Sequence, residues 1–284
     1  MANLQITANN TMDKFSLIDV STAVYMTYFR CYRNYNPNRP EEVVVKYLKQ
    51  QLLALIEPAI QPGYYPVLLF DCKQNGVYWR QNFIDNHAAY YSELWANPKT
   101  GNGMNAAGAV NDEKYKGGRL KSTDYNPILK LTWIAARQLA EQYVCFEEPG
   151  LEADDFAGLL VAYKPDNVSL DLVTVDRDWA MLLRNETIRF IDLYPKRRYQ
   201  IEYTEDAVKY FQNKIHSSIE TPEEAAYWKA KLGEKSDNCL PGSHVELVDL
   251  VNHAAPISYG FQDAHDRVIN FFSNPQSSAL FPRS

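Results

Sequence analysis

The sequence predicts an α/β domain in which a central, mainly parallel sheet is flanked by helices. Two observations support this fold class. Short apolar segments alternate along the chain with longer segments of helical pattern, which is typical of α/β proteins. The 284 residues are 46% hydrophobic, which is enough to build the core of one large domain or of two small ones.

The expected strands are short and mostly end in an acidic residue. Helical patterns cover 40–56 and 126–142, each with Pro near its start, where proline is favoured in a helix. A further helix is expected to begin near residue 150. The segments expected to be strands are FSLIDV (15–20), YYPVLLFDC (64–72), YVCFEE (143–148), DLVTVDRD (171–178), TIRFIDL (187–193) and RYQIEY (198–203).

The helix that begins in GLEADDFAGLL (150–160) carries three acids in its first turn. One acid there would favour the positive end of the helix, but three acids repel one another. At about 100° per residue, Glu152 and Asp155 share a face with Phe156 and Leu159, and this is the apolar face. The sequence therefore predicts that two carboxylates point toward the interior of the protein, where charge needs a partner.

Other acids stand where the expected strands end. Asp19, Asp71 and Asp176 close three strands, and Asp178 follows two residues after the last of these. A single aspartate at such a position is usually a turn or cap residue. In open α/β sheets, however, ligand sites form outside the carboxyl ends of the strands. If the strands are neighbours, the acids converge, and a divalent cation such as Mg²⁺ or Mn²⁺ is the simplest counter-charge.

The motifs LIDVS, LLFDCKQNGVYWR, EKYKGGR, GLEADDFAG, TVDRDWAML and GEKSDNCLPG, in this order, resemble the 5′ nuclease family. That family comprises flap endonucleases, the 5′→3′ exonuclease domains of bacterial DNA polymerases, and phage exonuclease/ribonuclease H enzymes. The resemblance runs from about residue 15 to 242 and is strongest to a phage member. It implies a PIN-like fold with a helical arch insertion at 76–121 and a short α-helical C-terminal part.

The resemblance also implies a ligand set for two Mg²⁺ ions, for which Mn²⁺ could substitute. Glu234 departs from the family pattern, which has Asp there, so its carboxylate reaches a metal through water or not at all. Hydrolysis by two metal ions requires no Ser or His nucleophile. The expected metal ligands are Asp19, Asp71, Glu152, Asp154, Asp155, Asp176, Asp178, Glu234 and Asp237, and all except Glu234 are expected to be catalytic.

Four residues are expected to contact nucleic acid by the same resemblance. Lys116 and Arg119 of the arch would hold phosphates, and Tyr115 could stack on a base. Arg80 matches a basic position just past the second strand. The alternative is that the segment around 76–121 is an insertion loop with a solvated charge run.

The C-terminal part is expected to be small. The nuclease domain would cover 1–238 and a reduced helical region with a tail would cover 239–284. The family's glycine-rich hairpin, which grips duplex DNA, is absent after residue 238. In the tail, the apolar pieces VINFF and ALFP flank a polar linker, a pattern of a docking peptide for a replication partner.

Charge is compatible with a nucleic-acid substrate. The net charge is −6, but residues 1–150 carry +1 and the second half carries −7. Without the nine acids, the remainder would carry +3. No apolar run approaches the roughly 18 residues of a membrane span, and the four cysteines suggest neither zinc nor a disulfide framework. We expect a cytoplasmic monomer, in a bacterial host if the protein is of phage origin.

The expected function is hydrolysis of phosphodiester bonds in DNA with 5′ ends or flaps, and of the RNA in RNA–DNA hybrids. Two alternatives stay open. A PIN-type ribonuclease would share the acidic centre and the sheet, although such domains are usually shorter and lack the arch. A non-catalytic nucleic-acid-binding protein could retain the fold, although nine unpaired acids would then be costly.

Overall fold

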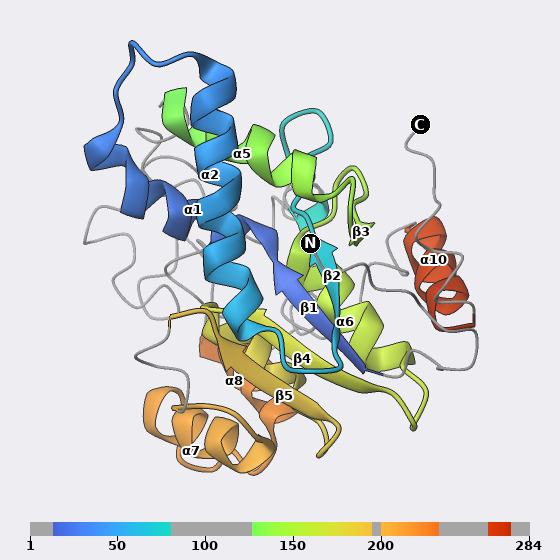
Figure 1. Cartoon of the computed structure of the whole chain (residues 1–284). Helices are drawn as coiled ribbons and strands as arrows, with labels where there is room; N and C mark the ends of the chain where they lie inside the picture. Colours follow the sequence, from blue (N-terminus) through green and yellow to red (C-terminus); the bar gives the residue numbers. More distant parts are fainter. Residues whose placement is uncertain (1–13, 81–126, 195–199, 233–260, 274–284) are drawn as a thin grey trace.

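The computed structural model of the chain describes residues 14–80, 127–194, 200–232 and 261–273 (Figure 1). Within these residues, five parallel strands form one sheet in the order β3-β2-β1-β4-β5. The prediction of an α/β fold with a mainly parallel sheet is confirmed. The strands are β1 (Lys14–Asp19), β2 (Tyr65–Leu69), β3 (Val144–Phe146), β4 (Ser169–Thr174) and β5 (Ile188–Asp192).

Helices cover both faces of the sheet. One face packs against α1 (Val20–Cys31), α2 (Glu41–Ile56) and α5 (Pro127–Leu139). The core on the other face includes α6 (Ala153–Tyr163) and a 3₁₀ helix, η4 (Arg177–Leu182). The remaining elements are the 3₁₀ helices η1 (Tyr32–Asn34) and η2 (Glu57–Ala59), and the helices α7 (Thr204–Lys214), α8 (Pro222–Leu232) and α10 (Gln262–Ser273).

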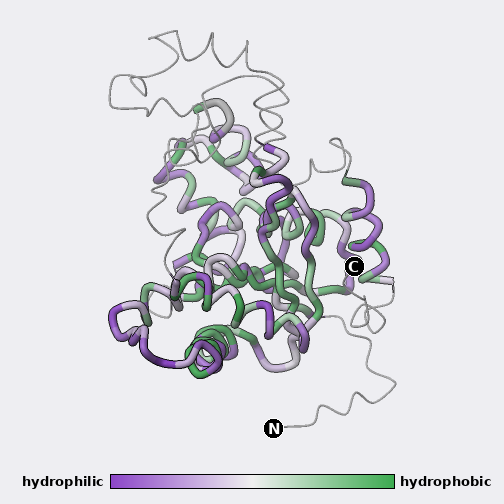
Figure 2. The backbone as a smooth tube through the Cα atoms, turned by 90° about the horizontal axis from the view of Figure 1, so that it is seen from above, coloured by the Kyte–Doolittle hydropathy of each residue, from purple (hydrophilic) through white to green (hydrophobic). Residues whose placement is uncertain are grey.

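Alternation along the strands divides the core into two layers. Leu17 and Leu69 point to the α6 side, whereas their chain neighbours Ile18 and Leu68 point to the α1 side. This is the two-residue period of a strand, and both faces are apolar because both are covered. Figure 2 shows the hydrophobic segments gathered along the central strands, with hydrophilic segments on the outer helices.

The C-terminal helix α10 belongs to this core. Val268 and Phe271 are buried, and the Phe271 ring lies 4.8 Å from Phe15 and 5.5 Å from Phe146, measured between ring centroids. Val268 and Phe271 of VINFF are therefore packed into the chain's own interior and cannot dock a partner from this position, whereas Ile269 is 37% exposed. The ALFP half lies outside the described residues.

The expected strands at 64–72 and 143–148 are shorter in the structure, and two further strand predictions differ from it. The segment 171–178 is a strand only as far as Thr174, because Asp176 caps η4 through its carboxylate and so ends the extended chain. The described part of the expected last strand, 200–203, is not a strand. It is joined to β5 by one backbone hydrogen bond, from Phe190 N to Glu202 O at 2.9 Å.

None of the helices in the described part of the chain is long and apolar enough to cross a membrane.

Candidate functional site

The candidate site lies at the carboxyl edge of the sheet, between β1 and β4, where the order of the strands reverses. From β1 the chain proceeds through β2 to β3 on one side, and it returns to the other side of β1 to form β4 and β5. Such a switch point is where α/β proteins bind ligands. Asp19 ends β1, Asp71 follows β2, and Asp176 follows β4, so the three acids stand at neighbouring strand ends.

Asp19 is held across the switch point by two threonines. It is 5% exposed and accepts hydrogen bonds from Thr22 N at 3.0 Å and from the hydroxyl of Thr174 at 2.7 Å. The Thr22 hydroxyl donates to the same carboxylate. Asp19 thus caps α1 and joins β1 to the end of β4, which fixes its position.

Asp71 connects the starts of two helices. Its Oδ2 accepts from the hydroxyl of Ser21 in α1 at 2.7 Å, and its Oδ1 accepts from the backbone N–H of Ala153, the first residue of α6, at 2.7 Å. The N-termini of α1 and α6 are therefore anchored to the end of β2. The positive ends of the two helix dipoles favour a carboxylate at this point.

Asp154, Asp176 and Asp178 complete the group next to Asp19. Asp154 Oδ1 accepts from the indole N–H of Trp179 at 2.7 Å. Asp176 is exposed and caps η4 by accepting from the backbone N–H of Asp178 at 2.9 Å. Asp178 is about one-third exposed and is paired with the Lys229 Nζ at 2.6 Å.

The charges of these aspartates act on one another. Burial raises the pKa of Asp19, and the nearby charge of Asp154 raises it further against three hydrogen bonds that lower it. Although Asp176 is exposed, the protein around it partly desolvates its carboxylate, and this desolvation, followed by the charges of Asp178 and Asp154, raises the pKa of Asp176 well above its usual value. Shifts of this kind mean that the ionised group is destabilised until a cation joins it.

Glu152 and Asp155 point inward as predicted, being 1% and 0% exposed, but they meet an arginine. Arg80 donates to Glu152 at 2.7 Å and to both oxygens of Asp155, at 2.7 and 3.2 Å. Burial raises the pKa of Asp155 to about 6, even though the guanidinium of Arg80 lowers it. Arg80 was expected to contact nucleic acid. Because it is 2% exposed, its contacts here are internal, and the nucleic-acid role stays a prediction.

Two other buried acids show what a structural carboxylate looks like in this protein. Asp171 is paired with Arg189 on the adjacent strand through two contacts of 2.9 Å, and Asp192 is paired with Arg177 at 2.7 Å. Each buried charge thus has an arginine partner, as buried ionised groups require. For Asp19, Asp154 and Asp176, the contacts described above come from hydroxyl, indole or backbone donors.

The sequence analysis missed the residues that orient the acids. Thr174, Trp179 and Trp79 are donors to Asp19, Asp154 and Asp155, respectively. A weak signal was present for Lys229, since it follows the buried residues Ala225 and Ala226 of α8 at helical spacing and therefore lies on the packed face. A lysine at such a position requires an anionic partner.

Some of the predicted site residues lie outside the described residues. These are Tyr115, Lys116, Arg119, Glu234 and Asp237.

The donor chemistry of the aspartates fits a divalent cation, since it consists of oxygen ligands with excess negative charge. In the parts of the chain that the structure describes, however, no group of three His, Cys, Asp or Glu side chains is placed to hold a metal ion. The carboxylates are instead turned to protein donors. The metal-binding role of each acid is therefore a prediction.

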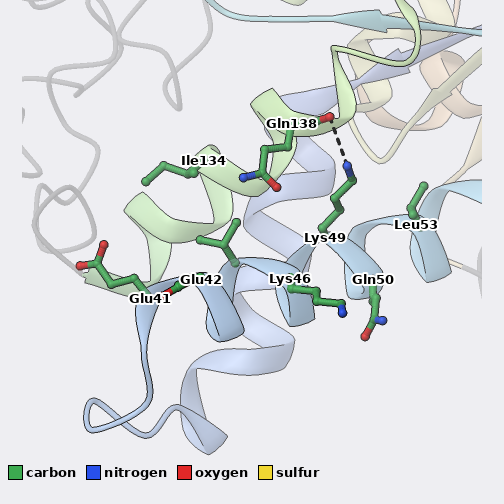
Figure 3. A pocket seen from close by; sticks show the side chains of 9 residues that line it. Glu41, Glu42, Lys46, Lys49, Gln50, Leu53, Ile134 and Gln138 are labelled. Carbon is green, nitrogen blue, oxygen red and sulfur yellow. Dashed lines mark hydrogen bonds between the residues drawn. The ribbon is translucent and has the colours of Figure 1, made fainter.

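A groove between α2 and α5 is separate from these acids (Figure 3). It is lined only by residues of these two helices, among them Glu41, Lys46 and Ile134, and by none of the nine predicted ligands. Lys49 donates across it to the backbone carbonyl of Gln138 at 3.3 Å, which joins the two helices. Its mixed charges favour no particular ligand.

No protein-family model and no curated protein matches the sequence. Solved structures with a similar fold include the bacteriophage T5 D15 protein crystallised with metal ions (13% identity, TM-score 0.48, 93% of each chain covered). A T5 5′-exonuclease with bound zinc gives 12% identity, a TM-score of 0.45 and the same coverage. A T5 flap endonuclease variant in a pseudo-enzyme–product complex with DNA and metal ions gives 14%, 0.47 and 94% of each chain. At these identities and TM-scores, the likeness assigns neither a family nor a function.

Proposed function

We propose that this chain is a metal-dependent nuclease that hydrolyses phosphodiester bonds at 5′ ends or flaps of DNA and in the RNA of RNA–DNA hybrids. One observation carries the proposal: carboxylates from the ends of β1 and β4 and from the start of α6 meet at the switch point of a parallel sheet, and their charges destabilise one another. The motif resemblance to 5′ nucleases supplies the reaction and the substrate class.

The repulsion explains why the proposed activity needs a cation. Asp19, Asp154, Asp176 and Asp178 present negative charge to a substrate that is itself a polyanion, so the two would repel without a counter-charge. Divalent cations such as Mg²⁺, when bound by carboxylates, supply charge stabilisation and activate water for phosphodiester hydrolysis. No serine or histidine nucleophile is needed.

The chain's own residues hold the carboxylates in place for this role. The Thr22 and Thr174 donors fix Asp19 between β1 and β4, and the indole of Trp179 orients Asp154. The ammonium of Lys229 restrains Asp178. Such support by hydroxyl, indole and ammonium donors holds the carboxylates in fixed positions, as a site for divalent cations requires.

The proposal is tested by one cleavage assay with three labelled substrates: a 5′ flap, a blunt duplex and an RNA–DNA hybrid, each with Mg²⁺ or with EDTA. We expect cleavage of the flap and of the hybrid with Mg²⁺ and none with EDTA. Cleavage of the RNA strand of the hybrid without cleavage of either DNA substrate would favour the PIN-type ribonuclease. Binding of all three substrates without cleavage would favour the non-catalytic protein, and undiminished cleavage in EDTA would contradict the metal requirement.

The predicted phosphate contacts of Lys116 and Arg119 are tested by salt dependence. Each substitution, Lys116→Ala or Arg119→Ala, removes one phosphate contact and is expected to reduce the slope of log affinity against log salt by about 1, because about one counterion fewer is released. The measurement is flap-DNA binding in EDTA between low and moderate salt. An unchanged slope for both variants would mean that EKYKGGR is a solvated loop. Lys130→Ala, in the described helix α5, is the matched control.

A further inference from the structure

Arg80 has the contacts of a fixed counter-ion. Its Nη1 lies 2.7 Å from Glu152 Oε2 and 3.2 Å from Asp155 Oδ2, and its Nη2 lies 2.7 Å from Asp155 Oδ1. This is a two-pronged pairing with Asp155 to which Glu152 is added. All three residues are at most 2% exposed, and a guanidinium stays charged at any pH at which the protein is folded.

The oxygens of Asp155 are already in use. Oδ1 accepts from Arg80, and Oδ2 accepts from three donors: the Arg80 Nη1, the Trp79 indole N–H at 3.1 Å, and the backbone N–H of Glu152 at 2.8 Å. A carboxylate offers about four lone-pair positions in all. A metal ion at Asp155 would have to displace these donors and would also be placed against the positive guanidinium.

The segment that carries Arg80 is fastened to the loop before α6. Trp79 N donates to Gly150 O at 2.9 Å, Gly150 N donates to Cys72 O at 2.7 Å, and Cys72 N donates to Leu151 O at 2.9 Å. Gly150 has φ +95°, and a Cβ there would stand 3.1 Å from the Phe261 ring. The backbone on both sides of the ion pair is therefore fixed, and Arg80 is held where it is.

The buried acids can be compared by the partner that each one has. Glu152 and Asp155 resemble Asp171 and Asp192, because the partner of each is an arginine. They differ from Asp19, which accepts from hydroxyl and backbone donors at the switch point. The acids at the start of α6 thus divide within one helical turn. Asp154 faces the other aspartates, and its two acidic neighbours face Arg80.

We propose that Arg80 is a positioning residue that neutralises Glu152 and Asp155 and so removes both from the metal-ligand set of the site. This rests on the proposed function in one respect, namely that the chain binds divalent metal. Arg80 holds the first turn of α6 by its two carboxylates, and this directs the carboxylate of Asp154, which lies between them, toward Asp19 and Asp176. The inference reassigns two of the nine predicted ligands.

The first test compares two substitutions that each remove one negative charge at the start of α6, one at its N-cap and one in its first turn. Mn²⁺ binding is measured by calorimetry without DNA for the wild-type chain, Glu152→Gln and Asp154→Asn. Substitution of residues that only support a metal ligand typically weakens metal binding by roughly 10- to 100-fold. Asp154→Asn removes a proposed ligand itself, so it is expected to weaken binding by roughly 10-fold or more. Glu152→Gln is expected to change the Kd by less than about tenfold, below that range. Equal or greater weakening by Glu152→Gln would overturn the proposal.

The second test needs no metal and so separates this inference from the proposed function. In EDTA, Arg80→Met is expected to lower the urea midpoint, because it leaves two carboxylates buried without a counter-charge. The triple variant Arg80→Met/Glu152→Gln/Asp155→Asn is expected to have a higher midpoint than Arg80→Met. If Arg80→Met does not fold, the triple variant is still expected to fold and to have a measurable midpoint. A triple variant no more stable than the single one would overturn the role of Arg80. If the wild-type chain binds no Mn²⁺, the proposed function fails, and this second test still decides the role of Arg80.

Discussion

Asp176→Asn is expected to reduce Mg²⁺-dependent cleavage of a 5′ flap by at least about 100-fold, a loss typical of removing one electrostatic contact to a reacting group. The substitution removes a charge and keeps the fold. Asparagine can still accept the hydrogen bond from Asp178 N and is a good helix cap, so η4 starts at the same place. Flap cleavage under saturating Mg²⁺ measures the effect, and unchanged cleavage would remove Asp176 from the site.

The same variant is expected to be slightly more stable than the wild-type chain in EDTA. Desolvation and the charges of Asp178 and Asp154 raise the pKa of Asp176, so the folded state binds a proton more tightly than the unfolded state does. The contribution of Asp176 to the stability of the wild-type chain therefore falls as the pH rises above about 4. The gain from Asp176→Asn should be present at pH 7 and absent near pH 4. It should be small, because Asp176 is exposed and water screens its charge. Asp166→Asn, at an exposed position after α6, is the control.

Phe271→Ala is expected to reduce the free energy of unfolding by about 3–5 kcal/mol, the usual cost of removing a buried aromatic ring. Phe271 is 1% exposed and packs against Phe15 of β1 and Phe146 of β3, so its removal leaves a cavity between α10 and the sheet. Equilibrium unfolding in urea, followed by circular dichroism, gives the value.

Ile269→Ala is the matched control for this experiment, since Ile269 lies on the same helix and is 37% exposed. It should change stability by no more than about 0.5 kcal/mol, as surface substitutions usually do. If Phe271→Ala were equally mild, α10 would be only loosely attached to the core, and VINFF would again be available to a partner.

The positions of the acids at the sheet edge were predictable, because they follow from local patterns. Short apolar segments ending at Asp19, Asp71 and near Asp176 give parallel strands, and parallel strands place their ends at one edge. The inward direction of Asp155 follows from its helical spacing with Leu159, whereas Glu152 is the extended N-cap residue before α6. These inferences need only the period of each element and the order of the elements along the chain.

The partners of the acids were not predictable, because they depend on side-chain contacts between distant segments. Arg80 is 72 residues from Glu152, and Lys229 is 51 residues from Asp178. Since nothing in a single sequence states which cation meets which anion, the guanidinium beside Glu152 and Asp155 could not be foreseen. The error at 200–203 has another cause. Ile201 and Tyr203 alternate with polar residues as in a strand, but the described sheet ends at β5.

Asp71 has a consequence for how the protein can be handled. Its two oxygens tie the beginnings of α1 and α6 to the end of β2 through a hydroxyl and a backbone N–H, and Arg80 and Lys229 offset part of the remaining charge. In the described part of the chain, protein donors thus hold the carboxylates at this edge of the sheet. A preparation purified with a chelator should contain native molecules, so that any ion can be added afterwards, in a chosen amount, to a protein that is already folded.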